Sequence, residues 1–350
     1  MLLSAPHLVG HLVEPAFGLL GDAWHRRTLI RGGGGAFAAA LVLIALGTTF
    51  WPLLAALALW SPASGAFVGL SQATLMDADP RGRERNMARW ALAGSVGMVA
   101  GPLAIGAAAS IGLGWRAAFV ALTVPTVLVV ALVWRSPLAS PPAAPAAGHP
   151  AEATLAAAFV AGARDAARAL RRWEVVRWLV LLECADLMLD VLLAYLALYF
   201  VDVVGVSGAQ AGLAVLVWTG VGLAGDALLL PLLERVRGTR YLRASALAVA
   251  VLFPAFLLVP AAAAKVALLG ALGLLNAGWY AILQARLYAA MPGRSATVLA
   301  LGNVSGLAGS LLPLAVGVAA DRLGLGAAMW LLLLAPVALL VGLPRRVPDE

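Results

Sequence analysis

The amino-acid sequence predicts an all-α membrane protein whose helices form two related bundles. Three observations support this fold class. Hydrophobic residues make up 63% of the 350 residues and charged residues only 12%, whereas a soluble domain is about half apolar and about a quarter charged. The apolar residues are gathered into runs long enough to cross a bilayer. Landmarks of the first half of the chain recur in the second half at a constant offset.

Eleven apolar runs are each near the roughly 20 residues that a helix needs to span a membrane. Short turns separate them, and alternate turns are rich in Arg, beginning with the turn after the first run. The predicted spans are residues 4–21, 33–50, 53–76, 91–112, 116–134, 177–201, 208–231, 241–260, 263–288, 296–320 and 325–343.

The positive charges lie on one side of these spans. Alternate connections, together with the C-terminus, hold 21 of the 24 Lys and Arg residues, and only Arg116, Lys265 and Arg322 fall on the other side. Because cytoplasmic loops of membrane proteins are enriched in Lys and Arg, the C-terminus is predicted to be cytoplasmic and Met1 to lie outside. This placement in short turns argues against nucleic acid as the partner of a chain with a net charge of +7.

Other functional classes lack the residues they need. Cys184 is the single cysteine and lies inside an apolar run, so neither an internal disulfide nor a metal site of Cys/His type is expected. No Gly-rich loop ends in Lys-Ser or Lys-Thr, which argues against a nucleotide site. The N-terminus lacks the charged region and cleavage site of a signal peptide. We therefore expect no metal, no cofactor and no enzymatic activity.

The segment between the fifth and sixth spans differs in composition. Residues 136–150 are rich in Pro and Ala and are interpreted as an irregular linker. Residues 152–172 have helical composition and several Arg residues. We interpret them as a solvated cytoplasmic surface helix without a partner, the alternative being an amphipathic helix at the membrane interface. The predicted organisation is an N-terminal bundle (1–135), a linker with a surface helix (136–175) and a C-terminal bundle (176–345).

The turn after the first span carries the most specific motif. Gly18 and Asp22 are followed by Arg26 and Arg27. Asp22 ends a helix, so the Arg residues could pair with it or cap the next helix. This turn resembles the loop after the second span of the major facilitator superfamily, although His25 stands where the pattern of that family usually has glycine. The resemblance implies two six-helix bundles around a central cavity, alternating access, and a cytoplasmic gate at these residues.

The two halves repeat at an offset of 211 or 212 residues, which extends the resemblance over nearly the whole chain. Asp22 falls on Glu234, which with Arg235 completes the predicted gate. The other coinciding pairs are Gln72 with Gln284, Pro80 with Pro292, Arg83 with Arg294, Pro102 with Pro313, Gly106 with Gly317 and Phe119 with Trp330.

The repeat also predicts that one helix of the first bundle is missing. The counterpart of span 177–201 would lie before Met1, so the sequence contains five plus six spans of an expected six plus six. By the offset of the repeat, we expect a stretch of about 37 residues upstream to encode one apolar span with a cytoplasmic N-terminus.

The fourth span contains a run of small residues around a proline. Gly97, Gly101, Pro102 and Gly106 are predicted to allow close helix packing and a kink. The run resembles the fifth-helix motif of antiporters in the same superfamily, with Ile105 in place of one glycine, and mildly favours export. The Arg of the familiar drug/proton antiporters has no counterpart near Ser61.

Acidic residues within the spans are the candidate coupling site, because a charge at membrane depth usually faces a cavity or a partner. Glu183, Asp186 and Asp190 are spaced to share one face of a helix. Burial disfavours the charged form of a carboxyl group, so we expect Asp186, helped by the other two acids, to exchange protons during transport. The alternative is packing against a basic partner.

Further candidates lie in the first span and in the second bundle. His11 and Glu14 share a helix face, and Asp226 is the repeat counterpart of Glu14. These two acids are predicted either to take part in coupling or to brace the cytoplasmic gate. Asn276, Trp279, Tyr280 and Gln284 are predicted to line the cavity, although Trp and Tyr near span ends often anchor a helix at the membrane interface.

The sequence thus predicts a secondary active transporter of small molecules in the cell membrane. Proton-coupled efflux of amphipathic compounds by a monomer is the first interpretation. Proton-coupled uptake of a polar metabolite is the alternative, and a non-transporting membrane sensor of the same fold is the alternative of another class.

Overall fold

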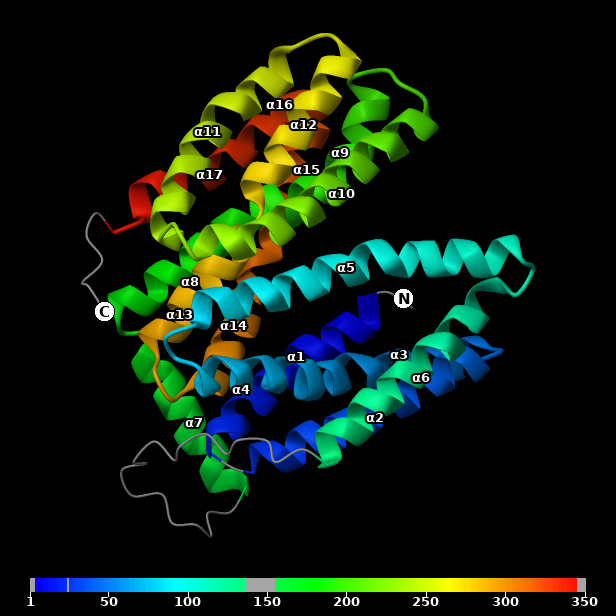
Figure 1. Ribbon diagram of the computed structural model, residues 1–350, viewed down its shortest axis with the longest axis vertical. Helices are drawn as coiled ribbons and strands as arrows, with labels where there is room; N and C mark the ends of the chain where they lie inside the picture. Colours follow the sequence, from blue (N-terminus) through cyan, green and yellow to red (C-terminus); the bar gives the residue numbers. More distant parts are fainter. Residues whose placement is uncertain (1–3, 24, 136–154, 345–350) are drawn as a thin grey trace. The chain divides into compact units, whose positions relative to one another are not determined.

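The computed structural model describes residues 4–23, 25–135 and 155–344, which are helical over almost their whole length (Figure 1). The helices of the first half of the chain are α1 (Ser4–Ala23), α2 (Arg26–Leu46), α3 (Phe50–Ser64), α4 (Leu70–Ala78), α5 (Arg83–Ser110), α6 (Gly114–Arg135) and α7 (Leu155–Ala169). Those of the second half are α8 (Trp173–Asp186), α9 (Leu192–Asp202), α10 (Gly208–Leu233), α11 (Gly238–Leu258), α12 (Ala262–Asn276), α13 (Trp279–Ala290), α14 (Ser295–Gly309), α15 (Leu311–Leu323), α16 (Leu325–Ala328) and α17 (Leu334–Gly342). The all-α membrane fold class is confirmed.

Nine helical stretches of the described chain are long and apolar enough to cross a membrane. All eleven predicted spans are helical, but α1 and the stretch from α8 to α9 are not among these nine. The reason is chemical. The helix α1 carries Glu14, two histidines and prolines, and the α8–α9 stretch carries Glu183, Asp186 and Asp190 within eight residues. The two exceptions are therefore the helices that hold most of the predicted coupling residues.

Several spans are interrupted near their middle. A π turn, η1 (Gly65–Gly69), joins α3 to α4, and a second π turn, η2 (Leu187–Val191), joins α8 to α9. A 3₁₀ turn, η3 (Met329–Leu333), joins α16 to α17. Between α12 and α13 the chain breaks at Gly278, whose φ of 79° is a conformation that favours glycine. Such interruptions are where helices bend.

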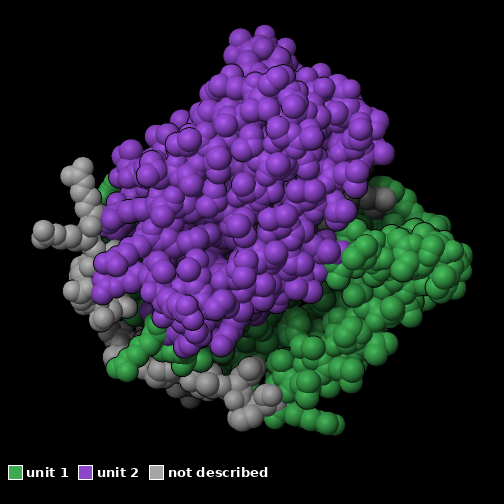
Figure 2. All heavy atoms as spheres, turned by 45° about the horizontal axis from the view of Figure 1, so that its top comes forward, with its two compact units in different colours: residues 1–81, 100–175, 288–304 green, residues 82–99, 176–287, 305–350 purple. Residues whose placement is uncertain are grey.

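The chain divides into two compact units that do not coincide with the two halves of the sequence (Figure 2). Unit 1 contains residues 1–81, 100–175 and 288–304, and unit 2 contains residues 82–99, 176–287 and 305–350. Each unit thus includes a segment from the other predicted bundle. The beginning of α14 belongs to unit 1, and the beginning of α5 belongs to unit 2.

Within unit 1, α2 packs against α3 and α6, and α1 packs against α3. Within unit 2, α10 packs against α12 and α9, and α11 packs against α12 and α17. The core of unit 2 includes the aromatic group Tyr199, Phe200, Phe253 and Phe256. Lys265 is buried against it, where its ammonium donates to the Tyr199 hydroxyl at 2.8 Å and to the Phe256 carbonyl at 2.6 Å.

The helix α7 differs from the predicted solvated helix without a partner. It packs on α1 so closely that a Cβ on Gly162 would lie 2.6 Å from the Leu19 carbonyl oxygen. Its Asp165 forms ion pairs with Arg168 and with Arg294, which directly precedes α14. Gly162 permits the close approach because it has no side chain. The ion pair of Asp165 with Arg294 supplies a specific contact that composition alone does not reveal. The predicted irregular linker 136–150 lies outside the described residues.

Candidate functional site

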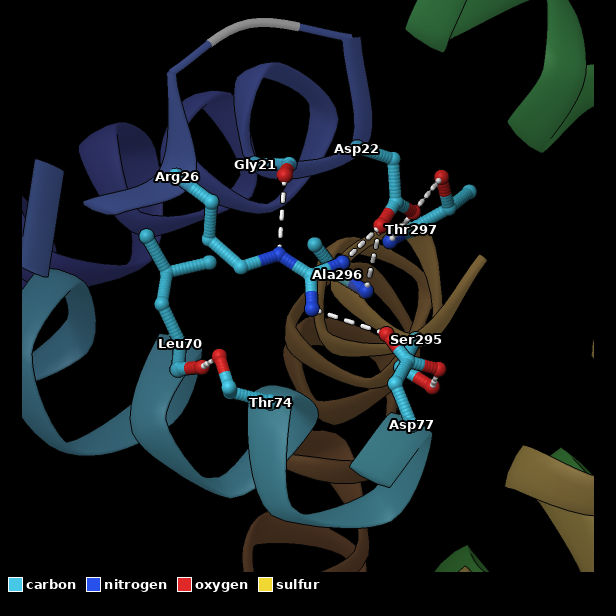
Figure 3. Close-up of polar contacts among 9 residues, drawn as sticks. All are labelled: Gly21, Asp22, Arg26, Leu70, Thr74, Asp77, Ser295, Ala296 and Thr297. Carbon is cyan, nitrogen blue, oxygen red and sulfur yellow. Dashed lines mark hydrogen bonds and ion pairs between the residues drawn. The ribbon is translucent and has the colours of Figure 1, made fainter. Parts of the chain in front are cut away.

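The predicted gate motif forms a buried charge cluster in unit 1 (Figure 3). Arg26, in the first turn of α2, donates from Nη1 to Asp77 Oδ2 at 2.8 Å and from Nε to the Gly21 carbonyl oxygen at 2.9 Å. Its Nη2 forms an ion pair with Asp22 at the end of α1. Arg26 and Asp77 are both buried. One guanidinium therefore holds carboxylates from the ends of two helices, α1 and α4.

Asp22 also binds the beginning of α14. Its Oδ2 accepts hydrogen bonds from the Thr297 backbone N–H at 2.6 Å and the Thr297 hydroxyl at 2.7 Å, and its Oδ1 accepts one from the Ala296 N–H at 3.1 Å. Ser295 donates its hydroxyl hydrogen to Asp77. The first backbone N–H groups of a helix lack partners within the helix and carry partial positive charge. The carboxylate of Asp22 therefore supplies the acceptor that this helix terminus requires.

Gly18 permits the close contact between α1 and α14. A Cβ on this residue would lie 2.7 Å from both the Ala296 carbonyl oxygen and the Ala300 nitrogen. Arg27 is exposed beside the cluster. The structure thus brings Gly18, Asp22 and Arg26 together as the motif predicts, although their role as a gate stays a prediction.

The second predicted gate pair is not brought into a comparable cluster. Glu234 and Arg235 are exposed in the turn between α10 and α11. The ion pair in this part of unit 2 is instead formed by Glu84 Oε1 and Arg286 Nη2, 2.7 Å apart. A Cβ on Gly238 would lie 2.7 Å from Glu84 Oε2. Gly238 stands where the repeat places the counterpart of Arg26.

Five residues of these two clusters were not predicted from the sequence. They are Asp77, Glu84, Arg286, Ser295 and Thr297. Some signal was present, because Asp77 is an acid at the end of a span that carries no other, and Glu84 follows the repeat landmark Arg83. Their partners lie 51 to 275 residues away in sequence, a separation that local patterns do not encode.

The predicted acidic stripe lies on α8 and η2 in unit 2. Glu183 and Asp186 are partly buried, whereas the π turn that follows Asp186 leaves Asp190 exposed. Glu183 forms a side-chain hydrogen bond with Ser305. Its carboxylate lies on the backbone of α14, since a Cβ on Gly309 would lie 1.7 Å from Glu183 Oε2. Among the described residues, no Lys or Arg forms an ion pair with any of the three acids.

The acids Glu14 and Asp226 are both partly buried, in unit 1 and unit 2 respectively. The Ser61 hydroxyl lies 3.5 Å from Glu14 Oε1, and the Ser95 hydroxyl lies 2.5 Å from Asp226 Oδ2. Neither acid is part of the Arg26 or Glu84 cluster. His11 lies on α1, but its side chain is outside the part that the structure describes.

The predicted cavity residues are mostly core residues in this conformation. Trp279 is fully buried and donates its indole N–H to the Ser245 hydroxyl oxygen at 2.9 Å, and Asn276 and Gln284 are also buried. Tyr280 is 40% exposed. Because a buried indole N–H requires an acceptor, Trp279 is held inside the core of unit 2. A lining role for Trp279, Asn276 and Gln284 stays a prediction.

The small residues of α5 do not make the predicted close helix packing. A Cβ on Gly97, Gly101 or Gly106 would meet no described atom within 4 Å. Pro102 lies within α5 without interrupting it. Small residues permit a close approach but do not enforce one, because packing also requires a second helix placed against them.

Comparisons with known proteins agree with this arrangement. The family model of the Major Facilitator Superfamily matches residues 1–313. The E. coli fucose:proton symporter FucP is similar in structure with a TM-score of 0.75 and 13% identity, over 97% of this chain and 90% of that one. The structure of FucP in the outward conformation has a TM-score of 0.74 and 14% identity, over 97% of this chain and 88% of that one.

The proton:xylose symporter XylE, bound to 6-bromo-6-deoxy-D-glucose, gives a TM-score of 0.71 and 16% identity, over 97% of this chain and 84% of that one. No curated protein matches the sequence significantly. At these identities the structural likeness concerns the fold alone, whereas the family model covers most of the sequence. The chain therefore belongs to the Major Facilitator Superfamily and is a multi-pass membrane protein with a transporter fold.

Proposed function

We propose that the protein carries a small molecule across the cell membrane by alternating access, coupled to protons through the acids of α8 and η2. The observation that carries the proposal is the group Glu183, Asp186 and Asp190 in an apolar helix, without an ion pair to any described Lys or Arg. A charged residue at the centre of a membrane helix costs about 2.5 to 3.5 kcal/mol on insertion scales. Packing alone does not explain three acids there.

Asp186 is the proposed proton carrier of the group. Glu183 is held by Ser305 and lies against Gly309 of α14. Asp190 is exposed. Asp186 lies between them and forms no hydrogen bond with another described residue, so its carboxyl group is free to bind and release a proton. Its position directly before the π turn η2 places it where the helix can change shape.

Two directions of transport remain candidates. The run Gly101-Pro102 in α5 resembles the antiporter motif and favours proton-coupled efflux of amphipathic compounds. The similar structures FucP and XylE are named as proton symporters of fucose and xylose, which favours proton-coupled uptake of a polar metabolite. The two candidates differ in the direction in which protons move relative to the solute.

The test is proton flux in proteoliposomes that contain a pH-sensitive dye. Externally added fucose or xylose should acidify the lumen if the protein is a symporter. Externally added ethidium, an amphipathic cation, should alkalinise the lumen if the protein is an antiporter.

Asp186→Asn should abolish proton-driven flux and spare solute exchange. Asp202→Asn, at an exposed acid at the end of α9, should leave both unchanged. Proton-coupled flux that persists in Asp186→Asn would refute the assignment of Asp186.

The same preparation separates a transporter from a sensor. Binding of a solute without counterflow would favour the non-transporting sensor of the same fold. Counterflow of any solute would support transport. We propose a monomer as the working unit, which cross-linking of the reconstituted protein can check.

A further inference from the structure

Glu14 and Asp226 occupy equivalent places in the two units. They are 212 residues apart, which is the offset of the repeat, and lie on α1 and α10. The helix α1 packs on α3 within unit 1, and α10 packs on α12 within unit 2. These two helix pairs are therefore related by the repeat.

Glycines near the two acids mark the same crossing point. A Cβ on Gly10 of α1 would lie 2.1 Å from Ser61 Oγ of α3. A Cβ on Gly273 of α12 would lie 3.1 Å from the Trp218 carbonyl oxygen of α10, and the Gly222 nitrogen is 3.6 Å from the same point. Gly222 and Gly273 are the counterparts of Gly10 and Ser61 at the same offset. Both crossings therefore place an acid one turn beyond a close contact of two helices.

At this point the helix facing each acid loses its regular hydrogen bonding. In unit 1 the π turn η1 begins at Gly65, one turn after Ser61. In unit 2 the helix α12 ends at Asn276, Gly278 takes a positive φ, and α13 begins at Trp279. The interruption begins at counterpart positions in the two units, although its form differs.

Side chains from neighbouring helices satisfy the interrupted backbone of unit 2. The Tyr241 hydroxyl donates to the Ala277 carbonyl oxygen at 2.8 Å. Asp226 accepts a hydrogen bond from the Gly278 N–H, just before α13, and one from the Ser95 hydroxyl at 2.5 Å. The acid thus links three elements of unit 2, namely α10, the break, and the beginning of α5. A buried N–H without such an acceptor would be costly.

Glu14 lies against the interrupted helix of unit 1. A Cβ on Gly65, the first residue of η1, would lie 2.4 Å from Glu14 Cγ, so the acid's side chain lies directly on this backbone. The Ser61 hydroxyl lies 3.5 Å from its carboxylate. Each unit therefore has the same combination of an acid, a serine hydroxyl and an interrupted helix.

We propose that Glu14 and Asp226 are positioning residues of two equivalent hinges, one in each unit. Each acid fixes the place where the facing helix bends, at η1 in unit 1 and at Gly278 in unit 2. The inference rests on the proposed alternating access for its role in transport, because that cycle requires helices that bend at defined points. It assigns the two acids a mechanical role distinct from the proton-carrying role of Asp186.

Two substitutions of Asp226 separate positioning from proton transfer. Asparagine retains an oxygen that can accept from the Gly278 N–H and an amide that can donate to the Ser95 hydroxyl. Leucine has nearly the same volume and offers neither group. A positioning residue is therefore rescued by Asp226→Asn and not by Asp226→Leu, whereas a proton carrier is disabled by both.

The experiment is amide hydrogen exchange of the full chain in nanodiscs, followed in peptides covering residues 276–284 and 62–72. Asp226→Leu should accelerate exchange around Gly278 about tenfold, as expected for a buried N–H group that loses its acceptor. Asp226→Asn and the control Asp202→Leu should match the unsubstituted protein. Unchanged exchange in Asp226→Leu, or equal acceleration in Asp226→Asn, would overturn the proposal.

Milder variants keep the test decisive if Asp226→Leu does not fold. Ser95→Ala removes one partner of the acid and should accelerate exchange around Gly278 by a smaller factor. In unit 1, Gly65→Ala should displace Glu14 and accelerate exchange in η1. Gly69→Ala is the matched control, because its Cβ would meet Leu299 Cδ1 at an ordinary 3.5 Å. These readouts do not depend on transport, so the hinges can be tested even if no transported solute is found.

Discussion

Unit 1 and unit 2 each contain a charge cluster at the beginning of a helix, and the two clusters are built differently. In unit 1, Arg26 lies between Asp22 and Asp77, and Asp22 accepts hydrogen bonds from the first turn of α14. In unit 2, the ion pair of Glu84 and Arg286 lies beside the beginning of α11. The cluster of unit 1 joins α1, α2, α4 and α14 through Arg26 and its two acid partners, whereas the ion pair of unit 2 joins α5 to α13.

Burial separates the two clusters further. The side chains of Arg26 and Asp77 are each 5% exposed, whereas those of Arg286 and Glu84 are 20% and 25% exposed. A buried ion pair becomes expensive when one partner is removed, because the other charge stays buried without compensation. A more exposed pair is screened by water and contributes little. The comparison teaches that corresponding helix ends in a repeat can carry contacts of very different energetic weight.

The largest expected effect is that of removing Arg26. Arg26→Met leaves Asp22 and Asp77 without their common cation and should destabilise the protein by about 3 to 5 kcal/mol. Thermal unfolding of the purified protein in detergent measures the change. Arg171→Met, at an exposed residue just after α7, is the control and should be nearly neutral. A neutral Arg26→Met would mean that the cluster of unit 1 is no stronger than that of unit 2.

Neutralising Asp22 should have an intermediate effect. Asp22→Asn keeps an acceptor for α14 but loses the charge that interacts with Arg26 and with the helix terminus, a loss of about 1.5 to 3 kcal/mol. If this contact closes the predicted cytoplasmic gate, inward-open forms should become more populated. Accessibility of introduced cysteines from the opposite side of the membrane should then fall. Asp321→Asn, at an exposed acid, should leave the accessibility unchanged, and an unaffected Asp22→Asn would contradict the gate role.

The smallest effect is expected in unit 2. Glu84→Gln removes the charge of a partly exposed pair and should cost about 1 kcal/mol or less. The change should shrink further at high salt, which screens exposed charges. Thermal unfolding at low and high ionic strength would measure both. A loss as large as that of Arg26→Met would abolish the difference between the two clusters.

The first cluster was partly predictable from the sequence because its centre is local. Asp22 and Arg26 are four residues apart, and the glycine before them is part of a recognisable turn. Asp77 and Thr297 are distant in sequence and meet the cluster only after α4 and α14 are in place. The repeat predicted Glu234 as the equivalent acid, whereas the ion pair beside the beginning of α11 contains Glu84, and Gly238 occupies the position that matches Arg26.

The hinges show a similar division. The acids Glu14 and Asp226 were predicted as a matched pair, since the repeat aligns them directly. The π turn at Gly65 and the break at Gly278 were not predicted, although Pro62 precedes the first and Asn276 the second. Such residues do not by themselves decide the outcome, since α5 continues through Pro102. The choice depends on groups from other helices, such as the Tyr241 hydroxyl and the Asp226 carboxylate.

By itself the sequence determined the membrane class, the approximate limits of the long apolar helices, and the internal repeat. These properties depend on the hydropathy of single residues and on spacing along the chain, which the tertiary environment does not alter. Only the tertiary structure decided which carboxylate meets which helix terminus and where the helices are interrupted. It also decided that Gly18 has a close neighbour, whereas Gly97 and Gly101 have no described atom within 4 Å of a Cβ. The physical reason is that hydrogen bonds and close packing require particular atoms within a few ångströms of each other. Residues up to 275 positions apart reach that distance only when the helices are assembled.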